Sequence, residues 1–234
     1  MPRASVIFAT YNEKENIVPL TKAVLAELKK AGISGQVVIV DDNSPDGTAE
    51  LAKREFRQNR AVKVVKRTER GLATALYRGI RESSGNVVVV MDADFSHEPG
   101  LVPKLVRLAE EHGVASGSRY VKGGGFRTKL HRSITTNLFT SYVKLMLGTR
   151  VSDYTMGFIA IRKDVLAKIE PGKVFYGYGD YSIRLFWQLR KKGIKVAEIP
   201  AFYAYRRAGQ TKTKVLNMGL QYGISVLKLK LGLK

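Results

Sequence analysis

Residues 86–94 read Asn-Val-Val-Val-Val-Met-Asp-Ala-Asp, a short β-branched apolar run that ends in two carboxylates. Such a run is typical of a strand buried within a sheet. Similar runs predict strands at Ala4–Thr10, Gln36–Val40, Ala61–Lys66, Val114–Ser118, Phe158–Arg162 and Lys195–Ile199. Segments with the helical period separate the first of these runs, which indicates crossover helices and a mostly parallel sheet. We therefore predict an α/β fold that is doubly wound.

Helices are predicted between these strands at Glu13–Ala31, Thr48–Asn59, Leu72–Glu82 and Pro99–His112. The ligand of an open α/β sheet binds beyond the carboxyl ends of its strands. Polar side chains follow four of the predicted strands, at 10–13, 41–43, 92–94 and 118–120. A binding site is expected where these four groups meet.

The composition excludes several classes of protein. The chain has 234 residues, 44% hydrophobic and 26% charged, with no cysteine, so disorder, a disulfide framework and a cysteine-ligated zinc site are excluded. The net charge is +20, and 14 of these charges lie in two stretches without Asp or Glu, 113–152 and 199–234. Such an excess indicates a polyanionic partner or, alternatively, a solvated basic face.

The carboxylates of Asp92 and Asp94 emerge together at a buried strand end. Hard oxygen ligands of this kind suit Mg²⁺ or Mn²⁺, which take further ligands from substrate phosphates. A solvated turn before Pro99 is the alternative.

A second acidic motif lies at residues 40–48, VDDNSPDGT. Its Pro-Asp-Gly turn needs neither Asp41 nor Asp42, so an acid here is placed to bind a nucleotide's base or ribose. No dinucleotide-binding or P-loop glycine motif is present.

The second half has a different pattern. A glycine-rich basic loop, 121–128, precedes a basic amphipathic helix predicted at Leu130–Leu147, with Leu130, Ile134, Leu138, Tyr142 and Leu145 on one face. A further helix is predicted near Asp180–Lys192, and the chain ends in an apolar and basic segment. No uninterrupted apolar run exceeds five residues, so no membrane span is expected. The three histidines, His97, His112 and His131, are predicted at surface or loop positions.

Several blocks occur in an order that we recognise: TYNE at 10–13, VDDNSPDGT at 40–48, MDADFSHEP at 91–99, GSRY at 117–120, residues 153–158, and RRAGQTK at 206–212. With these blocks the chain resembles the inverting glycosyltransferases of GT-A fold and, within them, the dolichyl-phosphate mannose synthases. The blocks cover nearly the whole chain. The resemblance implies a catalytic domain over residues 1–212 and a C-terminal amphipathic membrane-interface segment over 213–234.

The resemblance also implies roles for individual residues. It implies a nucleotide-sugar pocket made by Ala9, Tyr11, Glu13, Val40, Asp42, Asp92, Ala93 and Asp94. Asp92 and Asp94 would hold the metal, with Ser96 adjacent, and are expected to be catalytic together with Arg119. Phosphate contacts are expected from Arg119, Arg206, Lys212 and one of Lys129 and Arg132. The segment 177–183 departs from the family pattern beside the sugar and acceptor.

The implied reaction is a metal-dependent transfer of mannose from GDP-mannose to a polyprenyl (dolichyl) phosphate. UDP-glucose or another nucleotide sugar is the alternative donor. We expect a peripheral protein on the cytoplasmic face of an anionic membrane, and a membrane-anchoring subunit stays open as a further partner. A basic nucleic-acid-binding protein is the distant alternative, which the absence of a recognisable reading motif disfavours, so no nucleic-acid partner is expected.

Overall fold

The computed structural model describes residues 3–127, 130–148, 151–204, 207–208 and 215–233. Seven strands form the central sheet in the order β3-β2-β1-β4-β7-β5-β8. Their bounds are β1 Ala4–Thr10, β2 Gly35–Asp41, β3 Val62–Lys66, β4 Val87–Val90, β5 Val114–Ser118, β7 Ile159–Arg162 and β8 Ala197–Pro200. The predicted α/β fold is confirmed, because β1 pairs in parallel with both β2 and β4, and β2 pairs in parallel with β3.

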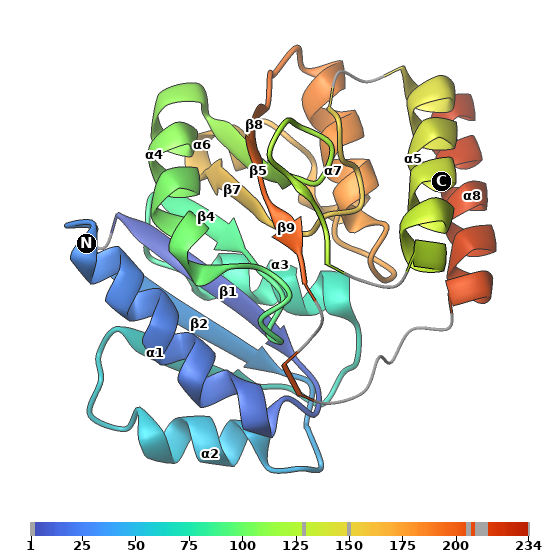
Figure 1. Ribbon diagram of the computed structural model, residues 1–234. Coiled ribbons are helices and arrows are strands. Elements are labelled where there is room, and N and C mark those ends of the chain that lie inside the picture. Colours follow the sequence, from blue (N-terminus) through green and yellow to red (C-terminus); the bar gives the residue numbers. More distant parts are fainter. Residues whose placement is uncertain (1–2, 128–129, 149–150, 205–206, 209–214, 234) are drawn as a thin grey trace.

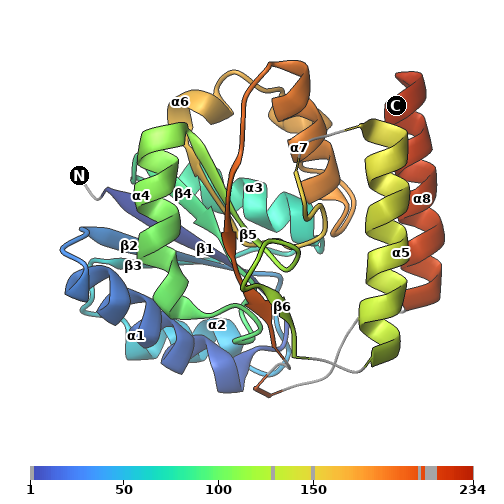
Figure 2. The same ribbon diagram turned by 45° about the horizontal axis from the view of Figure 1, so that its top comes forward.

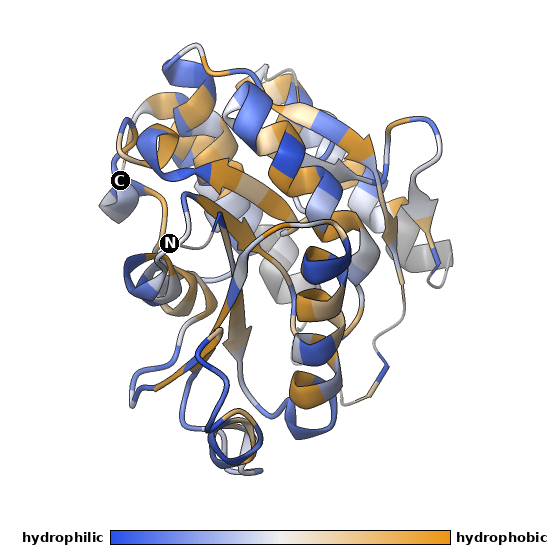
Figure 3. Cartoon of the chain, turned by 90° about the vertical axis from the view of Figure 1, so that its left-hand side faces the viewer, coloured by the Kyte–Doolittle hydropathy of each residue, from blue (hydrophilic) through white to orange (hydrophobic). Residues whose placement is uncertain are grey.

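The sheet lies between two layers of helices (Figure 1), and each layer buries its own apolar cluster against the strands. One face carries α1 Lys14–Lys30, α2 Thr48–Glu55 and α4 Val102–His112; the other carries α3 Leu72–Glu82, α6 Lys163–Leu166 and α7 Tyr181–Lys191. Alternation along β1 supplies both layers, since Val6 and Phe8 pack into the first and Ile7 into the second. Figure 3 shows the strands largely hydrophobic and the helices banded, as burial of one helix face requires.

Some element boundaries differ from the prediction. The predicted helix 48–59 ends at Glu55, and its N-cap position is Gly47 with φ 81°, while the Asp46 carboxylate accepts the backbone N–H of Thr48 at 2.9 Å. The predicted helix 99–112 divides into a 3-10 turn, Pro99–Leu101, and α4. The proline after the first residue of α4 removes a backbone donor there, which favours the division.

The larger difference lies at β7, which is antiparallel and inserted between β4 and β5. The sequence pattern predicts this strand but not its direction or its neighbours. A second, two-stranded sheet pairs β6 Gly125–Phe126 with β9 Phe202–Tyr203. It joins the glycine-rich loop to a segment far along the chain.

Helices α5 Leu130–Leu147 and α8 Val215–Leu231 lie side by side at the edge of the molecule (Figures 1 and 2). Within the described part of the chain, neither these helices nor any other has the length and apolar character that a membrane span requires. The outer face of α5 exposes Ile134, Leu138 and Leu145, whereas Tyr142, predicted on that face, donates from its hydroxyl to the Gly223 carbonyl of α8 at 3.2 Å.

Candidate active site

The first site element joins the loops after β1 and β2. In the register of these strands Ala9 lies opposite Val40, so two residues expected in the nucleotide pocket are neighbours. Backbone N–H groups of the first loop donate to side-chain oxygens of the second, from Asn12 to Ser44 Oγ (2.9 Å), from Glu13 to Thr48 Oγ1 (3.0 Å) and from Lys14 to Asp46 Oδ2 (3.1 Å). These bonds hold both loops in one arrangement at the carboxyl edge of the sheet.

Asp41 organises the second loop. Its fully buried carboxylate accepts hydrogen bonds from Thr10 Oγ1 at 2.9 Å, from the backbone N–H of Ser44 at 2.9 Å and from Ser44 Oγ at 2.5 Å. The expectation that the turn does not need Asp41 is therefore wrong. The N–H of Ser44 would otherwise lose its partner in a buried loop, and an unsatisfied buried donor costs about 1–3 kcal/mol.

Asp42 lies in an ion pair that the sequence pattern does not show. Arg67, which follows β3, donates to it through Nε (2.5 Å) and Nη2 (3.1 Å), and the backbone N–H of Gly71 donates at 2.8 Å. Both side chains are only 9% exposed. Two carboxylate oxygens offer about four lone-pair positions. Three are occupied, which leaves one acceptor position for a ligand.

Tyr11 and Arg70 form a stacked pair beside Asp42. The Arg70 guanidinium carbon lies 4.0 Å from the centre of the Tyr11 ring, and Arg70 also donates to the Tyr11 hydroxyl. Because Arg70 precedes Gly71, the loop that holds Asp42 also carries this arginine. The basic residues that end and follow the third predicted strand, Lys66, Arg67 and Arg70, are the sequence signal that could have identified this arginine.

The second site element is the turn after β4. Asp94 is 5% exposed as a residue, and its carboxylate accepts the backbone N–H of Ser96 at 3.0 Å. The backbone N–H of Asp92 donates to His97 Nδ1 at 3.2 Å, and His97 Nε2 lies 3.8 Å from Asp92 Oδ2. Because Nδ1 is the acceptor, the proton of the neutral imidazole lies on Nε2.

His97 corrects the prediction of a surface or loop position. It is fully buried, stacks on Phe158 with ring centres 4.9 Å apart, and meets the Tyr203 ring edge-on. Burial lowers its pKa, and the charge of Asp92 opposes that shift. His97 is therefore a neutral support for the turn rather than a solvated side chain.

The turn has the donor chemistry of a hard-cation site. Asp92 is 39% exposed at its side chain while Asp94 is buried, and the Ser96 hydroxyl is buried without a hydrogen-bond partner among the described residues. Within the described ranges, no cluster of three or more His, Cys, Asp or Glu residues could hold a metal. Two carboxylates and a hydroxyl fit Mg²⁺ or Mn²⁺ that keeps water and substrate ligands, not a fully protein-ligated metal.

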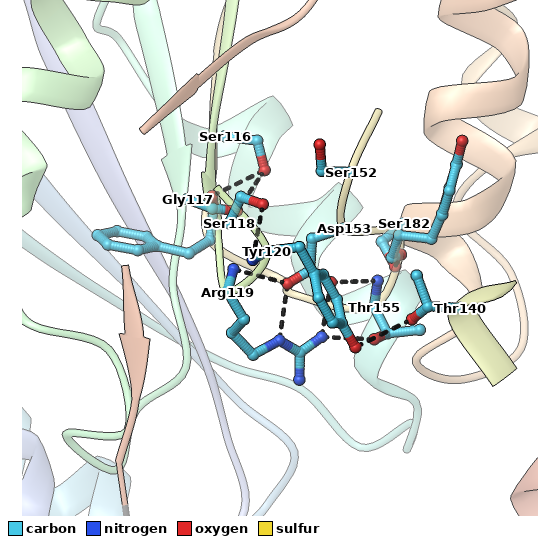
Figure 4. Close-up of polar contacts among 12 residues, drawn as sticks. Ser116, Gly117, Ser118, Arg119, Tyr120, Thr140, Ser152, Asp153, Thr155 and Ser182 are labelled. Carbon is cyan, nitrogen blue, oxygen red and sulfur yellow. Dashed lines mark hydrogen bonds and ion pairs between the residues drawn. The ribbon is translucent and has the colours of Figure 1, made fainter. Parts of the chain in front are cut away.

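Arg119, at the end of β5, is bound from within the protein (Figure 4). Its Nε and Nη2 donate to the two oxygens of Asp153 at 2.7 and 2.6 Å, and Nη2 also donates to Thr155 Oγ1 at 2.6 Å. The arginine side chain is 6% exposed and the Asp153 side chain fully buried. Its guanidinium also lies 4.8 Å from the centre of the Phe126 ring. One edge of the guanidinium is committed to Asp153, so a phosphate would have to approach the other.

The remaining predicted phosphate contacts belong to other segments of the chain. Arg206, Lys212 and Lys129 lie outside the described residues, as does the side chain of Arg132, although its backbone belongs to α5. Around the basic block, the backbone N–H of Ala204 donates to the Ser96 carbonyl and that of Arg207 to the Asp94 carbonyl, each at 3.0 Å. The described part of this segment therefore lies beside the acidic turn.

Tyr181 belongs to the segment that departs from the family pattern. A Cβ added at Gly157 would lie 2.7 Å from the Tyr181 hydroxyl and 3.9 Å from Asp92 Oδ1, so both groups border Gly157. Burial, and then the charge of Asp92, raises the pKa of Tyr181. The hydroxyl consequently stays protonated and can donate. The sequence contained no separate signal for this residue.

The chain is similar in sequence to known glycosyltransferases. Residues 5–170 match the profile of glycosyl transferase family 2. The dolichol-phosphate mannosyltransferase of Pyrococcus furiosus is 36% identical over 91% of this chain, which spans 59% of that relative's length. The undecaprenyl-phosphate mannosyltransferase of Micrococcus luteus is 33% identical over 90% of this chain and 87% of the relative.

The fold is also similar to a solved structure. The glucosyl-3-phosphoglycerate synthase of Mycobacterium tuberculosis, in complex with Mn²⁺, UDP and glucosyl-3-phosphoglycerate, has a TM-score of 0.70 and 19% identity, with 100% of this chain and 81% of that chain covered. This similarity concerns the fold, which is that of the GT-A glycosyltransferases. The profile match and the mannosyltransferase relatives go further, and they show that the chain belongs to glycosyl transferase family 2.

Proposed function

We propose that the protein transfers mannose from GDP-mannose to a polyprenyl phosphate with inversion at the anomeric carbon. The observation that supports this most directly is the meeting of the Ala9–Val40 strand ends and Asp42 with the acidic turn Asp92–Asp94 at one edge of the sheet. The strand ends with Asp42 would bind the nucleoside, and the acidic turn would serve its diphosphate. The similarity to two polyprenyl-phosphate mannosyltransferases supports this donor and acceptor class.

Each residue has a role in this proposal. Tyr11, Glu13 and Asp42 bind the nucleoside, and Asp92 and Asp94 would hold Mg²⁺ or Mn²⁺. When bound, such a cation supplies the charge neutralisation that a departing diphosphate needs. His97 and the backbone of Ser96 keep the two carboxylates in place, because they hydrogen bond to the turn from within the core.

The acceptor supplies its own nucleophile. A phosphate monoester, with a second pKa of about 6, is largely dianionic at pH 7. One of its oxygens bonds to the anomeric carbon while the bond to the nucleoside diphosphate breaks on the opposite side. No protein group has to remove a proton in this step. We assign the free edge of the Arg119 guanidinium, with Arg206 and Lys212, to binding phosphate.

We also assign α5 and α8 to an anionic membrane surface on its cytoplasmic face. Leu138 and Leu145 of α5 are 69% and 82% exposed, and α8 exposes Ile224, Leu227 and Leu231. Lys144 on α5, and Lys228 and Lys230 on α8, lie on the same two helices. A basic side chain close to an anionic membrane contributes about 1 kcal/mol to binding. Apolar side chains with neighbouring lysines suit the boundary between headgroups and acyl chains.

The test is a donor screen. Purified protein is incubated with a polyprenyl phosphate in vesicles, with GDP-mannose or UDP-glucose, and with Mg²⁺, Mn²⁺ or a chelator; lipid-linked sugar is quantified and its anomeric configuration determined by NMR. We expect transfer from GDP-mannose, loss with chelator and the inverted configuration. Transfer from UDP-glucose alone would replace the donor assignment, and retained configuration would refute the mechanism.

A further inference from the structure

The C-terminal helix α8 makes a close contact with the loop that precedes α7. Val226 of α8 is fully buried in the second apolar layer, together with Phe175 and Tyr181. One turn earlier, the Tyr222 hydroxyl lies against Gly179, where a Cβ would overlap with the hydroxyl oxygen. A larger residue at 179 would therefore have to displace Tyr222 or the loop, although the backbone φ of Gly179 is not in the left-handed region.

The buried side chain of Arg184 forms hydrogen bonds along the same loop. This arginine is fully buried and donates through Nε to the Val174 carbonyl at 2.9 Å and through its other nitrogens to the Tyr176 carbonyl and the Asp180 carboxylate. Nη1 also lies 3.4 Å from Ser225 Oγ of α8. One guanidinium therefore connects the beginning of the loop, its end and the C-terminal helix.

The loop in turn borders both halves of the candidate active site. It leads directly into Tyr181, whose hydroxyl borders Gly157, as does the Asp92 carboxylate. On the other side, the Gly177 carbonyl lies 4.0 Å from where a Cβ of Gly71 would be, and the N–H of Gly71 binds Asp42. Residues 174–181 thus contact α8 and border Gly157 and Gly71, which lie beside Asp92 and Asp42.

We propose that Tyr222 and Arg184 are positioning residues that make the seating of α8 a condition for the active geometry of residues 174–181. Ile224 and Leu227, on the exposed side of the same helix, belong to the surface assigned to the membrane. A helix that carries both contacts links the lipid-facing surface to the sugar side of the site. The role of the loop in sugar transfer rests on the proposed function, whereas the contacts of Tyr222 and Arg184 do not depend on that function.

The contact allows a clash-and-rescue experiment on the full chain. Gly179→Ala places a methyl group against the Tyr222 hydroxyl and should displace the loop from α8. Adding Tyr222→Phe removes the hydroxyl and leaves the ring Cζ at 3.4 Å, an ordinary contact. Gln221→Ala, an exposed neighbour on α8, is the matched control. The measurements are kcat and KM with vesicles containing the polyprenyl phosphate, the Kd of the nucleoside diphosphate, and amide exchange of residues 174–181.

We expect Gly179→Ala to lower kcat about 10- to 100-fold, the range that follows a misplacement of around 1 Å. Amide exchange of 174–181 should rise, any change in the nucleotide Kd should be smaller than the change in kcat, and the double variant should recover both kcat and protection. The inference is overturned if exchange rises without a change in kcat, or if the double variant recovers neither. If the wild-type protein transfers no sugar at all, the proposed function fails, while restored protection would still establish the α8 contact.

Discussion

The pair of Arg119 and Asp153 offers a prediction that separates a fold role from a site role. Asp153→Ala leaves the guanidinium in place, 6% exposed and without its carboxylate. Removing one partner of a buried ion pair costs about 3–5 kcal/mol, because the other charge stays uncompensated. With a urea m-value of about 2–3 kcal/mol/M, the unfolding midpoint should fall by about 1–2.5 M.

The reverse variant, Arg119→Met, should cost less. The Asp153 carboxylate would still accept the backbone N–H groups of residue 119 at 3.1 Å and of Thr155 at 3.2 Å. The double variant Arg119→Met/Asp153→Ala has no unpaired buried charge, so we expect it to recover most of the stability lost in Asp153→Ala. The assay is urea unfolding followed by circular dichroism, with the coupling energy taken from the double-mutant cycle.

Transfer activity then separates the two roles. The double variant should be folded but should transfer sugar poorly, because the phosphate-facing edge of the guanidinium is absent. Additive losses in the cycle would show that the two side chains are not coupled. Wild-type transfer by the folded double variant would show that Arg119 serves the fold alone, and the phosphate assignment would be withdrawn.

Three further predictions follow from the contacts. Asp94→Ala should abolish transfer, because it removes one of the two carboxylates assigned to the metal, and should cost about 1–3 kcal/mol of stability for the buried Ser96 N–H that loses its acceptor; near-wild-type turnover in saturating Mg²⁺ would refute the metal site. Arg67→Met should raise the KM for the donor and lower the Tm, because Asp42 loses two of its three donors; an unchanged donor KM would remove Asp42 from the nucleotide pocket. Leu138→Ser with Leu145→Ser should release the protein from anionic vesicles in flotation assays and leave the Tm nearly unchanged, because both side chains are mostly exposed. Retained flotation would show that α5 does not contact lipid.

Sequence periodicity predicted much of the architecture. The ranges of β1, β5, α3 and α5 agree with the predicted segments residue for residue, and the other predicted strands and helices are present with shifted ends. A strand or helix shows its buried face within a window of some ten residues, so the pattern is readable without the rest of the chain. The sequence also predicted where the polar groups of the candidate site gather, because parallel strands end at one edge of the sheet.

Tertiary structure decided the roles of individual polar residues. Asp41 and Asp42 are adjacent in the sequence, yet one binds its own turn and the other binds Arg67, 25 residues away. His97 is a core residue because the turn after β4 folds back onto Phe158, the residue before the antiparallel strand β7. The direction and position of β7 are equally invisible to a local pattern, since periodicity records burial and not which strand lies next to which.

The sequence by itself thus determined which segments are buried, in which secondary structure, and at which edge of the sheet the polar groups meet. These properties come from hydrophobic burial, which acts on residue type and spacing alone. Only the tertiary structure decided which charge meets which, as between Arg119 and Asp153, 34 residues apart, or between Arg184 and α8. Hydrogen bonds and ion pairs need their atoms within about 3 Å and correctly oriented, and loops and strand order, not sequence spacing, bring distant residues that close.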